Sequence, residues 1–138
     1  FCLSRGLGDV YKRQAKAIGK VVPSVNGKLQ GHAQRVQVPD GSVTELTTVL
    51  NTETTADEIN AAFKAAFSDT DYYGYNDEGI VSSDILGDTH GGVFDPTQTD
   101  VNTIDGVTLA RTVSFYDNEY GFTSNMIRTL LYFAEISE

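Results

Sequence analysis

The spacing of apolar residues predicts an amphipathic helix over residues 55–67. Its apolar side chains recur at the interval of one helical face: Ile59, Ala62, Phe63, Ala66 and Phe67. Thr55 and Glu58 have the separation of a capping box, which satisfies backbone N–H groups at the start of a helix. We expect the apolar face of this helix to pack on a sheet.

Strand-like segments occupy much of the remaining chain. Residues 41–51 are rich in β-branched side chains, and Pro39-Asp40-Gly41 just before them is a turn signal. We therefore expect residues 28–40 and 41–51 to form two antiparallel strands. Further strands are expected over residues 80–86 and 92–99, and Asp105-Gly106 is followed by another that reaches Asp117.

Helical patterns precede and follow these strands in the sequence. Residues 15–22 have the composition of the last turns of a helix, which Pro23 then stops. Near the other end, apolar residues at helical spacing predict an amphipathic terminal helix: Met126, Ile127, Leu130, Leu131 and Ala134. Strands grouped between separated helices, with short connections, predict an α+β fold with a largely antiparallel sheet covered by helices.

The amino-acid composition argues against some classes of binding partner for this chain. The 138 residues carry a net charge of −9, which disfavours binding to nucleic acid or an anionic membrane surface, because phosphate groups attract clustered Lys and Arg. No apolar run approaches the roughly 18 to 20 residues that span a bilayer, and no secretory signal pattern opens the chain. We expect a cytoplasmic protein with a small-molecule or protein partner. The single cysteine, Cys2, cannot form an internal disulfide.

Residues 1–14, "FCLSRGLGDVYKRQ", differ from the rest of the chain. They contain three basic residues and one acidic residue, and they show no apolar period that continues into the next segment. The segment resembles translated adapter sequence at the end of an assembled read; the alternative is a disordered N-terminal arm. We expect one domain over residues 15–138.

Two common ligand motifs match the sequence only in part. Counted from Asp69, Gly74 falls at the sixth position of a calcium loop, but Ile80 stands at the twelfth, where a bidentate Glu is needed. The pair Gly6-Leu7-Gly8 opens a dinucleotide fingerprint, but Tyr11 stands where its third glycine belongs. We predict no metal site.

The two histidines give little further chemistry. His32 and His90 have no cysteine or second histidine at a ligand spacing. Asp84, Asp88 and His90 could form a charge-paired cluster in space. For His90 a structural or exposed role is favoured over general acid–base work.

Arg35 and Asn118 have both a structural and a functional interpretation. Arg35 lies in a predicted strand, where its guanidinium could pair with an acid or present its donors to a phosphate. Asn118 lies in "SFYDNEYGFTSN", at a predicted strand-to-helix junction, where it could cap the helix. Its amide could instead offer a donor and an acceptor to a ligand carboxamide. From spacing alone the structural interpretation is favoured for both.

Three segments in order, "AKAIGKVVPSVNGKLQGHAQRV", "VSSDILGDTHGGVFD" and "SFYDNEYGFTSNMIRTL", resemble the C-terminal catalytic part of phosphorylating glyceraldehyde-3-phosphate dehydrogenase. The resemblance covers residues 15–138. It implies NAD-dependent oxidation and phosphorylation of glyceraldehyde 3-phosphate to 1,3-bisphosphoglycerate in glycolysis, by a cytoplasmic homotetramer. It also implies that the C-terminal helix would pack on a Rossmann domain that is missing here.

The resemblance assigns roles to two residues of this chain. Arg35 matches the arginine that binds a phosphate of the substrate or the attacking inorganic phosphate. Asn118 matches the asparagine that orients the nicotinamide carboxamide and so fixes which face of the ring receives hydride. The family's Ser-Cys-Thr-Thr-Asn motif and activating histidine do not occur here, and neither Cys2 nor His32 lies in a matching motif. No catalytic residue is therefore expected.

Several positions depart from the family pattern. Residues 11–14 replace the Ser/Thr-Gly pair that binds phosphate directly before "AKA". Phe115 stands where Trp is usual, Phe122 where many members have Tyr, and Gln37 where Pro is usual. These three single changes are compatible with an active parent enzyme.

These features predict an inactive, truncated fragment of the dehydrogenase, in keeping with Phe1 at the start. The apolar face around Met126, Ile127 and Leu130 would lose its partner, and such exposure promotes aggregation. The alternative is a non-catalytic stand-alone binding or interaction module with the same fold. A calcium-binding module is a more distant alternative.

Overall fold

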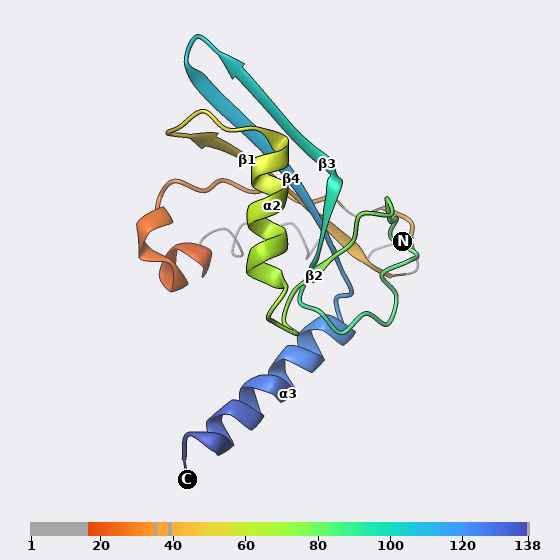
Figure 1. The fold of residues 1–138 in the computed structure, drawn as a ribbon. Coiled ribbons are helices and arrows are strands. Elements are labelled where there is room, and N and C mark those ends of the chain that lie inside the picture. Colours follow the sequence, from red (N-terminus) through yellow and green to blue (C-terminus); the bar gives the residue numbers. More distant parts are fainter. Residues whose placement is uncertain (1–16, 35, 39, 138) are drawn as a thin grey trace. The chain divides into compact units, whose positions relative to one another are not determined.

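The computed structural model describes residues 17–34, 36–38 and 40–137. The chain divides into two compact units, one ending at Gln37 and one spanning Val38–Glu138. Figure 1 shows the elements in chain order: η1 (Pro23–Val25), β1 (Ser42–Leu50), α2 (Ala56–Phe67), β2 (Gly74–Tyr75), β3 (Val93–Ile104), β4 (Val107–Tyr116) and α3 (Tyr120–Glu135).

The first unit contains a helical stretch over residues 17–21, followed by the 3₁₀ turn η1. Pro23 opens that turn, as expected for a residue that ends an α-helix. The strand predicted over residues 28–40 is wrong in its described part, because residues 29–34 and 36–38 form no strand. The turn signal at Gly41 is real, with φ of 86°, but the strand after it pairs with β4.

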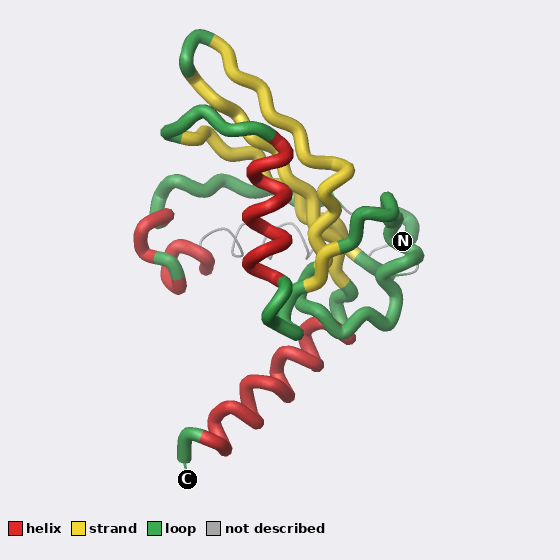
Figure 2. The backbone as a smooth tube through the Cα atoms, viewed as in Figure 1, coloured by secondary structure: helices red, strands yellow, loops and turns green. Residues whose placement is uncertain are grey.

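The second unit is built on a four-stranded sheet with the order β1-β4-β3-β2. The β1–β4 and β3–β4 pairs are antiparallel, and only the short β2 runs parallel to β3. The sheet and helices confirm the predicted α+β class (Figure 2). The hairpin between β3 and β4 turns at Asp105 and Gly106, with φ of 51° and 77°, which matches the Asp-Gly preference of tight hairpins.

Helix α2 covers one part of this sheet through its aromatic residues. The predicted capping box is present: Thr55 Oγ1 accepts from the backbone N–H of Glu58, and the Glu58 carboxylate accepts from the backbone N–H of Thr55. Phe63 stacks on Phe94 of β3, with ring centroids 4.2 Å apart. The small helix residues Ala62 and Ala66 are exposed, so the contact face is narrower than the sequence predicted.

The core of the described residues lies between α2, the sheet and the loop before β3. Its buried apolar side chains are Ile85, Val93, Phe94, Ala110 and Val113. Ile85 belongs to residues 80–86, where the predicted strand is wrong: residues 82–87 form turns. The Asp84 carboxylate accepts the backbone N–H of Val81 at 2.9 Å and closes one of these turns. The apolar residue in this segment therefore anchors a loop to the core.

Helix α3 confirms the predicted terminal helix, and Arg128 in its middle contacts the loop before β3. Arg128 Nη1 donates to the carbonyl oxygen of Thr89 at 2.8 Å, and its guanidinium lies 5.8 Å from the ring centre of Tyr72. The helix extends away from the sheet (Figure 1), and apolar residues on both sides of Arg128 are exposed: Met126, Ile127, Leu130, Leu131 and Phe133. Among the described helices, none has the length and apolar content needed to cross a membrane.

Candidate cofactor-binding site

The junction between β4 and α3 is organised by one buried carboxylate, Asp117, which is only 2% exposed. Its Oδ1 accepts the backbone N–H groups of Glu119 at 2.9 Å and Tyr120 at 2.7 Å. Its Oδ2 accepts the backbone N–H of Gly87 at 2.9 Å. One side chain thus satisfies free N–H groups at the start of α3 and ties the helix to the loop before β3.

These hydrogen bonds also set the charge state of Asp117. The N–H of Gly87, followed by that of Tyr120, lowers the pKa of the Asp117 carboxyl, and burial opposes this shift. Hydrogen bonds to the charged form favour ionisation. Asp117 is therefore a carboxylate whose oxygens are already engaged by the backbone.

Asn118, the next residue, projects from the same junction and is exposed. The hydroxyl of Ser42 donates to Asn118 Oδ1 at 2.6 Å, and Asn118 Nδ2 donates to Asp40 Oδ1 at 3.4 Å. The helix-capping interpretation of Asn118 is wrong, because its amide bonds to Ser42 and Asp40. The N-cap position of α3 is Glu119, and the Asp117 carboxylate accepts the nearby N–H groups. The Asn118 amide is consequently held at the surface by side chains of the segment that begins β1.

The surroundings of Asn118 are strongly acidic. Oxygen atoms of Asp40, Asp117 and Glu119 lie within 4.8 Å of one another. Partial desolvation, followed by the negative charge of Asp40, raises the pKa of the Glu119 carboxyl. Acidic groups crowded at one point repel anions and favour neutral or cationic ones. The junction therefore presents the Asn118 amide, held in one orientation by its partners, among negatively charged carboxylates.

The other predicted binding residue, Arg35, lies outside the described residues, so its position relative to Asn118 stays a prediction. Phe115 and Phe122, the two aromatic departures from the family pattern, lie within the part of the chain that the structure describes. Phe115 is half-buried in β4, opposite Val43 of β1. Phe122 is 71% exposed on α3.

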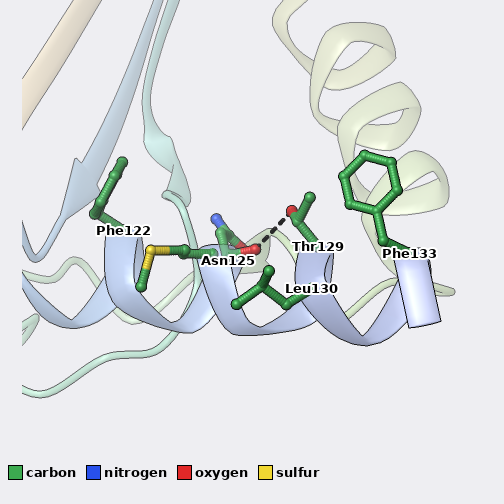
Figure 3. A pocket seen from close by; sticks show the side chains of 6 residues that line it. Phe122, Asn125, Thr129, Leu130 and Phe133 are labelled. Atoms are coloured by element: carbon green, nitrogen blue, oxygen red, sulfur yellow. Dashed lines mark hydrogen bonds between the residues drawn. The ribbon is translucent and has the colours of Figure 1, made fainter.

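Phe122 lines a shallow hollow of about 330 Å³ along one face of α3 (Figure 3). The lining residues are Phe122, Asn125, Met126, Thr129, Leu130 and Phe133. The hydroxyl of Thr129 donates to the backbone carbonyl of Asn125 at 2.8 Å, so it is satisfied within the helix. This hollow is apolar and does not include Asn118, which separates it from the junction site.

The predicted histidine cluster forms only in part. His90 Nδ1 lies 2.8 Å from Asp88 Oδ1, whereas Asp84 is used in its own turn and does not join them. The pair lines a second hollow of about 480 Å³ that also borders Lys64 and Tyr73. His32 is exposed in the first unit.

Sequence reasoning did not single out Ser42 or Asp117. Asp117 directly precedes Asn118 and is a preferred capping residue type, so its place just before a predicted helix was a usable signal. Ser42 had no such signal, because its contact with Asn118 depends on the pairing of β1 with β4.

The sheet, the terminal helix and the exposed amide at their junction define an α+β domain that carries part of a polar site at the end of its sheet. Residues 11–118 match the family model described as glyceraldehyde 3-phosphate dehydrogenase, C-terminal domain. The chain belongs to this family.

Relatives named glyceraldehyde-3-phosphate dehydrogenase support the same assignment. The chain is 55% identical to the one from Streptococcus pyogenes serotype M1 over 124 residues, which cover 90% of this chain and 36% of the relative. It is 57% identical to the one from Lactobacillus delbrueckii subsp. bulgaricus over 122 residues, 88% of this chain and 36% of the relative. For the relative from Streptococcus dysgalactiae subsp. equisimilis, 54% identity extends over 147 residues, 97% of this chain and 43% of the relative. The chain thus spans well under half the length of these relatives.

Proposed function

We propose that residues 15–138 are part of the catalytic domain of an NAD-dependent phosphorylating glyceraldehyde-3-phosphate dehydrogenase. Its parent would oxidise and phosphorylate glyceraldehyde 3-phosphate to 1,3-bisphosphoglycerate as a cytoplasmic homotetramer. In this proposal Asn118 orients the nicotinamide carboxamide, and Arg35 binds a phosphate of the substrate or the attacking inorganic phosphate. We propose that residues 1–14 lie outside this domain, although the match to the family model begins at residue 11.

The observation that carries the proposal is that Asp117 and Asn118, although adjacent in the chain, have different roles at the start of α3. Asp117 satisfies the N–H groups at the start of α3, so the neighbouring Asn118 amide is not needed for capping and stands exposed. A carboxamide ligand needs both a donor and an acceptor, and an amide side chain supplies both.

The charge around Asn118 supports a nicotinamide ligand in its oxidised form. Asp40, Asp117 and Glu119 crowd the junction with negative charge, whereas the oxidised nicotinamide ring is positively charged. A cationic ring is favoured in such a field over an anionic ligand. The phosphate groups of the cofactor and substrate would therefore bind elsewhere, as the proposal for Arg35 requires.

The cofactor accepts hydride when it is bound, and the protein supplies binding and orientation. The chemistry also needs a cysteine nucleophile and a base that activates it. The 138 residues contain one cysteine, Cys2, outside any matching motif. We infer that the 138-residue chain by itself does not catalyse the reaction.

The proposal is tested with the purified chain and with a chimera. The chain, supplied with NAD, glyceraldehyde 3-phosphate and phosphate, should form no NADH above a protein-free control. In the chimera, residues 15–138 replace the matching segment of the Streptococcus pyogenes enzyme, to which they are 55% identical. This chimera should form NADH. Turnover by the chain alone, or a folded chimera without activity, would contradict the proposal.

A further inference from the structure

We propose that Ser42 is a positioning residue that, with Asp40, fixes the orientation of the Asn118 amide so that an Nδ2–H group faces the ligand. This inference rests on the proposed function of Asn118 and adds to it. It assigns a role to the start of β1, and it states which atom of the carboxamide is recognised.

The contact between Ser42 and Asn118 follows from strand register. Ser42 is the first residue of β1 and pairs with Tyr116, the last residue of β4. Asn118 follows Tyr116 by two residues, so the register of the β1–β4 pair brings a hydroxyl beside the amide. The hydrogen bond is short, at 2.6 Å from Ser42 Oγ to Asn118 Oδ1.

The two partners of Asn118 determine which way its amide faces. An ionised carboxylate only accepts hydrogen bonds, so Asp40 must face the Nδ2 group, and it lies 3.4 Å from that atom. With Nδ2 facing Asp40, Oδ1 is the atom that faces Ser42. The Ser42 hydroxyl could donate or accept, and beside an acceptor oxygen it donates. The carboxylate thus fixes the amide assignment, which geometry alone leaves open.

This orientation has a chemical consequence for a bound carboxamide. Oδ1 is engaged by Ser42, and one Nδ2–H is directed at Asp40. The remaining Nδ2–H is the donor of this side chain that has no partner among the described residues, and it requires an acceptor, whereas Oδ1 keeps one lone pair beside its bond from Ser42. In a nicotinamide that acceptor is the carboxamide carbonyl oxygen rather than the carboxamide NH₂ group.

Substitutions in the chimera described above test this role by its effect on NAD binding. Ser42→Ala removes the donor, and Ser42→Thr keeps a hydroxyl on a residue type that strands favour. Loss of one net hydrogen bond predicts a KM for NAD raised about threefold to tenfold in Ser42→Ala. Ser42→Thr should stay within about twofold of the unsubstituted chimera on the same scale. The matched control is Thr44→Ala, an exposed hydroxyl removed from the same strand, which should leave KM unchanged.

A cofactor analogue tests the predicted atom. The 3-acetylpyridine analogue of NAD keeps the carbonyl oxygen but replaces the NH₂ group with a methyl group. If Nδ2–H of Asn118 donates to the carbonyl, Ser42→Ala should raise the KM for the analogue and for NAD by the same factor. A Ser42→Ala effect that is present with NAD and absent with the analogue would overturn the assigned orientation.

The outcomes separate this inference from the proposed function. An elevated KM in Asn118→Ala, together with equal values for Ser42→Ala and Thr44→Ala, would overturn the role of Ser42 and leave that of Asn118 standing. An unchanged KM and kcat in Asn118→Ala would overturn both. Independently of turnover, the side-chain amide signals of Asn118 in the ¹⁵N-labelled chimera report the same contact. They should shift in Ser42→Ala and not in Thr44→Ala, and equal spectra would overturn the inference.

Discussion

The carboxylate of Asp117 accepts the backbone N–H of Gly87 at 2.9 Å, which joins the start of α3 to the loop before β3. The same carboxylate also caps the first turn of α3. Removing it therefore affects both the helix and the loop, and the residue beside it, Asn118, is the proposed ligand-binding residue.

We predict that Asp117→Asn lowers the free energy of unfolding by about 1–2 kcal/mol at pH 7, the usual range for a lost cap or buried hydrogen bond. Hydrogen bonds lower the pKa of Asp117 below its ordinary value of 3.8. The stabilising contribution of Asp117 is thus fully present above about pH 3.8 and is lost as the pH falls through the lowered folded-state pKa. Urea unfolding between pH 3 and 7 should show a flatter pH profile for the variant. Asp100→Asn, at an exposed position of β3, is the control, and an equal effect there would contradict the prediction.

Gly121→Ala should destabilise the protein even though alanine favours helices. A Cβ atom at this position would lie 2.5 Å from the carbonyl oxygen of His90, which is a backbone atom. The first turn of α3 would have to move away from the loop, which outweighs the gain of up to about 1 kcal/mol in helix propensity. Thermal unfolding of the variant measures the effect.

The matched control is Gly92→Ala, where the nearest atom to a new Cβ is 3.9 Å away. That variant should have unchanged or slightly raised stability, because it restricts the unfolded chain without a clash. Equal unfolding temperatures for the two variants would show that the close contact at Gly121 does not exist.

The stacking of Phe63 on Phe94 predicts a large cost for truncating either ring. Phe94 is 1% exposed, and Phe94→Ala should lower the free energy of unfolding by about 3–5 kcal/mol through lost burial and a cavity. Phe122→Ala makes the same truncation at a residue that is 71% exposed, and it should change stability by less than about 0.5 kcal/mol. Chemical denaturation of both variants checks the pair, and comparable losses would refute the assigned core.

The exposed apolar residues of α3 predict concentration-dependent association of the 138-residue chain. Met126→Gln combined with Leu130→Gln should reduce association, since it removes two exposed apolar side chains without adding charge. Light scattering over a concentration series measures this, with Ile104→Gln, at a 58% exposed residue of the hairpin, as the control. A chain that stays monomeric without these substitutions would instead favour the stand-alone binding module.

The parts of the fold that could be predicted from sequence were those set by local pattern. The capping box at Thr55, the periodicity of α2 and the Asp105-Gly106 turn each have a signal within a few residues. The strand predicted over residues 80–86 was wrong, because the apolar character of Ile85 reflects burial of a turn. A short apolar run does not by itself distinguish these two cases.

The candidate site was less predictable because it depends on contacts between distant segments. Asn118 was found by resemblance, but its partners Ser42 and Asp40 are 76 and 78 residues away in the chain. Only the pairing of β1 with β4 brings them together. The capping role was assigned to the wrong neighbour, because spacing alone does not tell Asp117 from Asn118 at one helix start.

The central claim, that Asn118 orients the nicotinamide ring, is tested most directly by the stereochemistry of hydride transfer in the chimera. Glyceraldehyde 3-phosphate deuterated at the aldehyde carbon transfers its label to C4 of the cofactor, and NMR of the product distinguishes the two faces of the ring. The unsubstituted chimera should label one face, whereas Asn118→Ala should have lower kcat/KM and label both faces. Undiminished kcat/KM with label on a single face in Asn118→Ala would contradict the claim.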